Sequence, residues 1–251
     1  MNKIVIENLT LKYTDGTESL NGISLNIVAN ATTVLFGPAG GGKSSLLRCL
    51  NRLNDLADVE SVSGRILLDG VDILDPKTDV IALRRKVGMV FARPVVLPFS
   101  IRGNLTYGLE LAGENRKSRH DEAIERSLKL AALWEEVHDR LDEPAIALSG
   151  GQQQRLCLAR SLALEPEVVL LDEPTSGLDP ISTSKVEAAL HELKKLYTVV
   201  LVPHSVQQAA RTSDYAAFFL QGKLIEYAPG TDIFTNPQTQ RTEDYVTGRF
   251  G

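Results

Sequence analysis

The stretch GPAGGGKSS, residues 37 to 45, decides the fold of this chain. It matches the spacing G-x-x-x-x-G-K-[ST], and the matching residues are Gly37, Gly42, Lys43 and Ser44. The apolar run TVLF precedes this glycine loop, and leucines at helical spacing follow it, so the motif stands between a strand and a helix. That setting predicts a phosphate-binding loop and argues against a glycine-rich turn that matches by chance.

The chemistry of phosphate accounts for the residue types in the glycine loop. Phosphate oxygens carry dense negative charge and need several backbone N–H donors at close range, which glycines permit. We expect the Lys43 ammonium to neutralise the outer phosphates and the Ser44 hydroxyl to bind Mg²⁺. The residues expected to bind phosphate groups here are Gly37, Pro38, Ala39, Gly40, Gly41, Gly42, Lys43, Ser44 and Ser45.

A second anion-binding helix start is predicted at LSGGQQQR, residues 148 to 155, which we call the signature segment. Ser149 is expected to cap the helix, while Gln152 reaches back to the amide of the capping residue. Gly150 and Gly151 let a ligand approach the backbone N–H groups at the positive end of the helix dipole. One chain of this size therefore carries two phosphate-binding helix starts.

Polar residues follow two apolar runs of strand length. VVLLDE places Asp172 and Glu173 at the end of a buried parallel strand, the edge where open α/β sheets bind ligands. Asp172 is expected to hold the Mg²⁺ shell and Glu173 to polarise a water for in-line attack. His204 follows the next run, TVVLV, and is expected at the same edge. The alternatives are a solvated acidic strand end and an ordinary surface histidine.

Composition limits the remaining possibilities. The 251 residues are 43% hydrophobic and 24% charged, typical of a soluble globular protein. The net charge of -5 argues against a surface devoted to nucleic acid. Cys49 and Cys157 stand far apart in leucine-rich helical patterns, which indicates core thiols in a reducing compartment. No window approaches the ~20 apolar residues of a membrane-spanning helix.

Periodicity divides the chain into three parts. Strands dominate the first third, where residues 4–13, a turn at Asp15-Gly16 and a second pair of strands within 24–36 indicate an antiparallel subdomain. From about residue 101 to 164 the pattern is helical, as in an inserted helical subdomain. After Pro166, strands alternate with helices, including one from Pro180 to about residue 196 that Asp179 caps. The fold class is α/β, with a parallel or mixed sheet.

The glycine loop, LSGGQQQR, VVLLDEP, SGLD and a downstream histidine, in this order, resemble the ATP-binding subunits of ABC transporters. Stretches such as LLRCLNRLNDL, GRILLDGVDI, LRRKVGMVF, AALWEEV, DPIST and TEDYVTGRFG are similar to the phosphate-importer ATPases. The resemblance implies a P-loop NTPase core within one ATPase domain, 1–251. It places the helical subdomain, with the signature segment inside it, at about 93–164.

The resemblance also assigns roles to residues. It implies that two subunits pair head to tail and enclose ATP between the glycine loop of one and the signature segment of the other. Ser149, Gly150, Gly151 and Gln152 would then serve the partner's ATP, and Asp179 would lie at the dimer seam. The catalytic residues would be Lys43, Glu173 and His204, the metal ligands Ser44 and Asp172. Tyr13 stands where the family places an aromatic that stacks on adenine, although an ordinary strand tyrosine fits equally.

The partners implied by the resemblance are a second copy, an integral membrane permease and, through the complex, an extracytoplasmic solute-binding protein, with no nucleic acid. The cofactors are ATP and Mg²⁺, and the place is the cytoplasmic face of the membrane, as a peripheral subunit. Three alternatives stay open: an importer of another solute, a relative that works on DNA or ribosomes, and a nucleotide switch with weak hydrolysis. The second class would tend to show a long coiled-coil insertion or two cassettes, and neither is present in the sequence.

Two positions depart from the family pattern. VGMVFARP places Ala92 where the family has a glutamine that contacts the metal, the water and the membrane partner. A methyl group cannot make those hydrogen bonds, so hydrolysis or its coupling is expected to be weaker unless Arg93 or a water replaces the link. Pro203 stands where a threonine is usual, which we interpret as a tolerated stiffening of the strand end.

Overall fold

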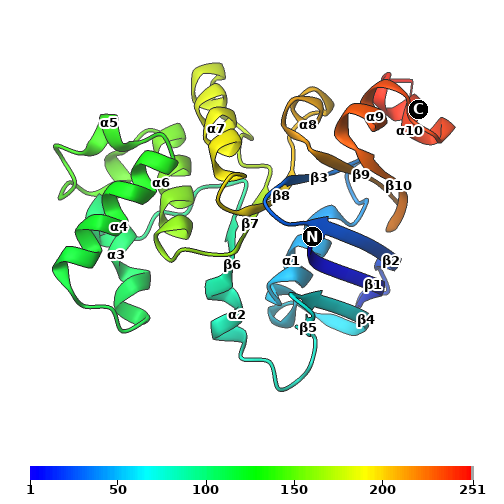
Figure 1. Cartoon of the computed structure of the whole chain (residues 1–251), viewed down its shortest axis with the longest axis horizontal. Coiled ribbons are helices and arrows are strands. Elements are labelled where there is room, and N and C mark those ends of the chain that lie inside the picture. Colours follow the sequence, from blue (N-terminus) through cyan, green and yellow to red (C-terminus); the bar gives the residue numbers. More distant parts are fainter. Residues whose placement is uncertain (250–251) are drawn as a thin grey trace.

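The molecule contains two β-sheets: the six-stranded sheet lies near the centre with helices beside it, and the four-stranded sheet lies at the lower right in Figure 1. The structure is a computed structural model that describes residues 1–249. The first sheet has four strands, in the spatial order β2 (Glu18–Val28), β1 (Asn2–Tyr13), β4 (Val59–Leu68) and β5 (Val71–Asp72). All pairs in this sheet are antiparallel, as predicted for the N-terminal subdomain. The turn at Asp15-Gly16 joins β1 to β2.

The second sheet has six strands and carries the functional edge. Their spatial order is β10 (Lys223–Pro229), β9 (Tyr215–Leu220), β3 (Thr32–Phe36), β8 (Thr198–Val202), β7 (Val168–Asp172) and β6 (Val87–Val90). Only the β9–β10 pair is antiparallel, so the sheet is mixed. Strands β3 and β8 are buried at every residue, because apolar residues cover both faces of this sheet.

Residues 24–36 do form two strands, but these strands belong to different sheets. β2 alternates buried and exposed side chains, whereas β3 is buried throughout and pairs with β8 and β9. Alternation is typical of a strand with one solvated face, and a continuous apolar run of a strand covered on both faces. The difference in pattern between the two strands therefore indicates the change of sheet.

The helices also have defined bounds. They are α1 (Lys43–Leu50), α2 (Val80–Lys86), α3 (Ile101–Leu111), α4 (Lys117–Leu130), α5 (Trp134–Val137), α6 (Gly150–Ala163), α7 (Pro180–Leu193), α8 (Val206–Thr212), α9 (Gly230–Thr235), α10 (Gln240–Val246) and the 3₁₀ turns η1 (Leu53–Leu56) and η2 (Ala145–Ala147). The helix predicted to reach residue 196 ends at Leu193, and Leu53 lies beyond the end of α1.

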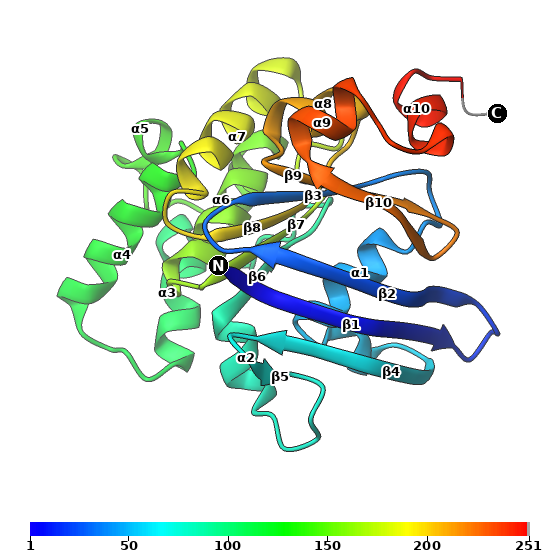
Figure 2. The same ribbon diagram turned by 45° about the vertical axis from the view of Figure 1, so that its right-hand side comes forward.

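Helix α1 packs between the two sheets (Figure 2). Its Leu46, Leu47 and Leu50 join one apolar cluster with residues of β1, β2, β7 and β8. Helices α3 to α6 lie together at one side of the molecule, and α7 stands between them and α8 (Figure 1). Ile124, Leu128 and Ala131 are buried there, which confirms the predicted apolar helix face.

Cys49 and Cys157 are free and buried, as predicted for core thiols. Burial raises the pKa of the Cys49 thiol to about 12, so it stays protonated at neutral pH. Within residues 1–249, no helix is long and apolar enough to cross a bilayer. The last two residues of the quoted tail, 250 and 251, lie outside the described residues.

Candidate functional site

The glycine loop connects β3 to α1 and is fixed by two close approaches to neighbouring strands. A Cβ on Gly37 (φ +136°) would lie 2.0 Å from the carbonyl oxygen of Phe219. A Cβ on Gly42 (φ +97°) would lie 2.3 Å from the carbonyl oxygen of Ser19. These glycines let the loop pack against the sheet, since any side chain there would collide with backbone. Gly40 also has a positive φ but faces open space.

The ammonium group of Lys43 bends back over the glycine loop. It donates hydrogen bonds of 2.8 Å to the carbonyl oxygens of Gly37 and Pro38. Burial lowers the pKa of Lys43, and the nearby Glu173 and Asp172 oppose that shift. The cation is therefore held at the mouth of the loop by carbonyl groups, in reach of anionic oxygens that bind there.

The sheet edge brings Asp172 to Ser44, which lies 128 positions away in sequence. The Ser44 hydroxyl donates a 2.9 Å hydrogen bond to Asp172 Oδ1. Asp172 ends β7 beside the buried Val202 of β8, and the side chains of Ser44 and Asp172 are half-buried. A hydroxyl beside a carboxylate is a set of hard oxygen donors, so these two residues fit Mg²⁺.

Glu173 lies at the same edge, facing the glycine loop. Together with Ser19 and residues 39–45 it lines a cavity of about 260 Å³. Its backbone is left-handed (φ +47°), and its N–H donates to the carbonyl of Val202 at 2.9 Å. Strained backbone of this kind persists only where the surroundings fix it, and here it follows a buried strand.

His204 also lies beyond the end of β8, at the edge where Asp172 and Glu173 stand, and its side chain is exposed. It does not line the cavity of the glycine loop. Its backbone N–H donates to Gln208 Oε1 at 2.9 Å. The structure thus brings Lys43, Ser44, Asp172 and Glu173 together and places His204 beside them.

Tyr13 is half-buried and its hydroxyl group points to α1. The hydroxyl lies 3.1 Å from Ser45 Oγ and donates to Asn54 Oδ1 at 3.3 Å. Ser19 and Asn54, which were not predicted, complete this network: the Ser19 hydroxyl donates to Ser45 Oγ at 2.7 Å, and the Asn54 amide donates to the Ser45 carbonyl at 2.9 Å. Stacking of the Tyr13 ring on adenine stays a prediction.

The signature segment begins α6 with the predicted capping box. Ser149 Oγ accepts from the Gln152 amide at 3.3 Å, and the Ser149 amide donates to Gln152 Oε1 at 3.0 Å. Gly150 is exposed and faces open space. Gly151 is buried, since a Cβ there would lie 2.3 Å from Ser182 Oγ of α7. None of these residues lines the glycine-loop cavity of the same chain.

Asp179 caps α7 directly beside the signature segment. Its Oδ1 accepts from the amides of Ile181 and Ser182, and its Oδ2 accepts from the Ser182 hydroxyl at 2.6 Å. These bonds from Ser182 lower the pKa of Asp179, so the carboxylate stays ionised. Pro180 takes the first helical position, as predicted.

Glu136 is the residue near the signature segment that sequence reasoning missed. Its carboxylate binds Arg155 at 2.8 Å, Lys185 of α7 at 2.5 Å and the Gln152 side chain at 2.9 Å. Arg155 is almost fully buried. Hydrogen bonds from Arg155, Lys185 and Gln152 overcome the effect of burial and lower the pKa of Glu136 to about 2. Glu136 therefore fixes the signature helix to α7.

Replacing Glu136 by Gln is expected to lower the free energy of unfolding by about 1–3 kcal/mol at pH 7, because Arg155 loses its counter-charge. A carboxylate whose pKa falls on folding stabilises above its unfolded pKa, 4.5, and loses that contribution as pH falls toward 2. The difference in free energy of unfolding between wild type and variant should therefore become smaller below about pH 5. Urea unfolding from pH 7 to pH 4 measures it.

The matched control is Glu143→Gln. Glu143 is half exposed and reaches Arg140 only at 3.5 Å, so its loss should change the free energy of unfolding by less than about 0.5 kcal/mol. Equal effects of the two substitutions at pH 7 would rule out a special role for Glu136.

The two departures from the family pattern have distinct surroundings. Ala92 is half-buried in the loop after β6, between Phe91 and the exposed Arg93. The Gln154 side chain of α6 donates to the carbonyl of Phe91 at 2.9 Å, so this loop is tied to the signature helix. Pro203 is buried at the end of β8, where its lack of an N–H breaks no hydrogen bond with the neighbouring strands.

The fold and the site define a P-loop nucleotide-binding protein that carries a second anion-binding helix start. The ABC transporter family profile matches residues 20–176. The chain belongs to the ABC transporter family and is an ATP-binding, ATP-hydrolysing subunit of that type.

Relatives are similar over nearly the whole chain. The phosphate import ATP-binding protein PstB 1 of Vibrio vulnificus is 55% identical over 99% of this chain and 91% of its own length. The phosphate import ATP-binding protein PstB of Shewanella denitrificans is 56% identical over 98% of this chain and 90% of its own length.

Solved structures support the same fold. The structure of cbiO1 from Clostridium perfringens, part of the ABC transporter complex cbiONQ, matches with a TM-score of 0.82 and 28% identity, covering 99% of this chain and 96% of that one. A bacterial Atm1-family ABC exporter with ATP bound matches with a TM-score of 0.80 and 26% identity, over 98% of this chain and 41% of the exporter chain.

Proposed function

We propose that this chain powers the import of inorganic phosphate through a separate membrane permease, as a Mg²⁺- and ATP-dependent head-to-tail dimer. The observation that supports phosphate as the solute is the identity of 55–56% to two phosphate import ATP-binding proteins over nearly the full length. The site in this chain supports ATP as the energy source, since the glycine loop, Lys43 and Glu173 surround one cavity at the sheet edge.

The residues divide the hydrolytic work. Lys43 and the amides of the glycine loop bind the triphosphate, and Ser44 with Asp172 would hold Mg²⁺, which neutralises charge on the phosphates when bound. Glu173 accepts a proton from the attacking water and orients it in line with the γ-phosphate. His204 contacts the γ-phosphate from the end of β8. Tyr13 stacks on the adenine ring.

The positions of the two helix starts support the proposed dimer. Within residues 1–249, no acceptor receives a hydrogen bond from the amides of Gly150 and Gly151, and the open side of Gly150 faces solvent. These amides and Ser149 would bind the partner's ATP, with Gln152 holding the cap and Asp179 at the seam. ATP bound by both chains would stabilise the pair by mass action.

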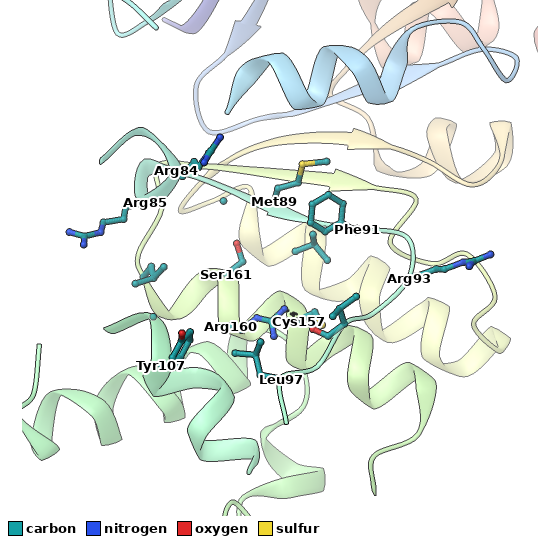
Figure 3. A pocket seen from close by; sticks show the side chains of 15 residues that line it. Arg84, Arg85, Met89, Phe91, Arg93, Leu97, Tyr107, Cys157, Arg160 and Ser161 are labelled. Atoms are coloured by element: carbon teal, nitrogen blue, oxygen red, sulfur yellow. Dashed lines mark hydrogen bonds between the residues drawn. The ribbon is translucent and has the colours of Figure 1, made fainter. Parts of the chain in front are cut away.

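A groove between α2–β6 and the helices α3 and α6 suits the permease (Figure 3). Its volume is about 310 Å³, and we call it the arginine groove because Arg84, Arg85, Arg93 and Arg160 line it and no acidic residue among residues 1–249 does. Its exposed apolar side chains include Val95, Phe91 and Tyr107. The groove contains the loop after β6, so an apolar helix with acidic residues on the permease fits it.

The chain would lie on the cytoplasmic face of the membrane as a peripheral subunit, and the permease would connect it to the solute-binding protein. Residues 1–251 would form one ATPase domain, with the helical subdomain at about 93–164. The net charge of -5 and the identity to two phosphate import ATP-binding proteins favour a transport subunit over a relative that works on nucleic acid.

Transport by a reconstituted complex tests the proposal. The chain is combined in vesicles with the permease and binding protein of a phosphate importer, and uptake of radiolabelled phosphate is measured with MgATP on the side of this chain. We expect ATP-dependent phosphate uptake, with sulfate uptake at background. ATP hydrolysis without phosphate uptake, or equal uptake of sulfate, would contradict phosphate as the solute.

The same vesicles test the arginine groove. Val95→Glu places a negative charge in the groove and should lower uptake and permease capture by about 10-fold, while ATP binding by the free chain is retained. Val71→Glu is the control, since Val71 is 67% exposed and Val95 is 66% exposed, and Val71 lies on the four-stranded sheet. If both variants bind the permease like wild type, the groove is not the docking site.

A further inference from the structure

The side chain of Gln208, on α8, is only 2% exposed and uses both ends of its amide. Oε1 accepts from the backbone N–H of His204 at 2.9 Å. The hydroxyl of Thr175 lies 3.2 Å from Oε1 and 3.0 Å from Nε2. Nε2 also donates to Glu187 Oε1 at 3.3 Å. One buried amide therefore joins three segments: the residue after β8, the turn after β7, and α7.

Each of the three partners belongs to a functional segment. His204 follows β8 at the sheet edge. Thr175 stands two residues after Glu173, in a turn that the Ser176 amide closes onto the Glu173 carbonyl at 3.0 Å. Glu187 lies on α7, the helix that Asp179 caps beside the signature segment. Gln208 thus contacts the residues that follow β7 and β8 and the second half of α7.

Residues on both sides of His204 in the sequence help to fix its main chain. Pro203 has no N–H, so the His204 amide is the first donor after β8, and Gln208 accepts from it. The Ser205 hydroxyl caps α8 by accepting a 3.2 Å hydrogen bond from the backbone N–H of Gln208. A fully hydrogen-bonded amide in a buried setting is rigid, because any shift leaves a polar group unpaired. The main chain at His204 is therefore held, while its side chain stays exposed.

We infer that Gln208 is a positioning residue for ATP hydrolysis: it holds the main chain of His204 and the Thr175 side chain in the turn after Glu173, and it links both to α7. The inference rests on the proposed roles of His204 and Glu173. Arg211, on the same helix, supports the link, since it binds Glu187 at 2.8 Å and holds that carboxylate toward Gln208.

Gln208→Met, which keeps the volume and removes every side-chain hydrogen bond of residue 208, tests the inference in the full-length chain. We expect kcat for MgATP to fall on the order of 10- to 100-fold, as for a displaced catalytic group, with KM for ATP changed less than about threefold. The control is Gln207→Met, because Gln207 is exposed on the same helix and should leave both constants unchanged. A kcat within twofold of wild type would overturn the inference.

An exchange of the two side chains gives a second measurement that does not depend on the folding of Gln208→Met. Gln208→Glu alone puts two carboxylates together and should lower kcat by about 10-fold or more. Adding Glu187→Gln restores a donor for each acceptor, and we expect kcat to recover to within about threefold of wild type. A double variant as slow as Gln208→Glu would overturn the inference.

The wild-type rate separates this inference from the proposed function. If the wild-type chain does not hydrolyse MgATP, the proposed roles of His204 and Glu173 fail. If wild type hydrolyses ATP and Gln208→Met matches it, only the inference about Gln208 fails.

Discussion

Replacing Glu173 by Gln is expected to lower kcat for ATP by about 10²- to 10⁴-fold, the range of general base catalysis. Glutamine has the size of glutamate and tolerates the same backbone, but its amide cannot take a proton from water. The ATP-binding cavity keeps Lys43, Ser44 and the amides of the glycine loop, so ATP affinity should change little. Release of phosphate from MgATP measures turnover, and binding of a fluorescent ATP analogue measures affinity.

The loss of hydrolysis should also change the oligomeric state. ATP that is not hydrolysed remains bound across the two chains, and a ligand bound at an interface stabilises the complex. We expect Glu173→Gln with MgATP to elute as a dimer in gel filtration, and the same protein without nucleotide to show less of it. A variant that binds ATP but gives no additional dimer would contradict the head-to-tail arrangement.

Glu165→Gln is the matched control for this experiment. Glu165 is also a glutamate with left-handed backbone (φ +52°), and its side chain is 64% exposed. Both substitutions therefore replace the same residue type in the same conformation, one at the sheet edge and one outside the site. If Glu173→Gln keeps more than one tenth of the wild-type kcat, as Glu165→Gln should, Glu173 is not the general base.

The parts of the site that follow local rules were predictable from the sequence. The glycine loop has strict spacing because its backbone must close on itself against the sheet, as the contacts of Gly37 and Gly42 show. The capping box of Ser149 and Gln152 spans four consecutive residues, so a short stretch of sequence contains it entirely. The meeting of Ser44 with Asp172 required only the rule that parallel strands end at one edge.

The residues that escaped prediction are single polar side chains with distant partners. Asn54, Glu136 and Gln208 each join segments through hydrogen bonds that depend on how whole elements pack. No periodicity marks such a residue, because one buried amide or carboxylate looks like any polar residue on a helix. The assignment of β2 and β3 to different sheets was also missed, although β2 alternates buried and exposed residues and β3 is a continuous apolar run.

Ala92→Gln is expected to raise ATP turnover by up to about 10²-fold, the usual effect of one well-placed polar group. Ala92 is half-buried in the loop after β6, and Gln154 fixes the preceding carbonyl to the signature helix, so a side chain at residue 92 starts from a held position. Glutamine there would supply the amide that the family uses to touch metal and water. Turnover is measured for the free chain and for the vesicle complex.

Arg93 is the neighbouring residue that could replace the missing glutamine, so its substitution is needed to interpret the Ala92→Gln result. Within residues 1–249 its exposed side chain makes no hydrogen bond or ion pair, so it is free to supply the polar contact that Ala92 lacks. Arg93→Gln should then slow wild type but leave Ala92→Gln unchanged, because the new glutamine makes the link. If wild type already hydrolyses ATP as fast as well-coupled relatives and Ala92→Gln leaves the turnover unchanged, Ala92 does not weaken hydrolysis. If turnover stays low in every variant, the chain works as a nucleotide switch.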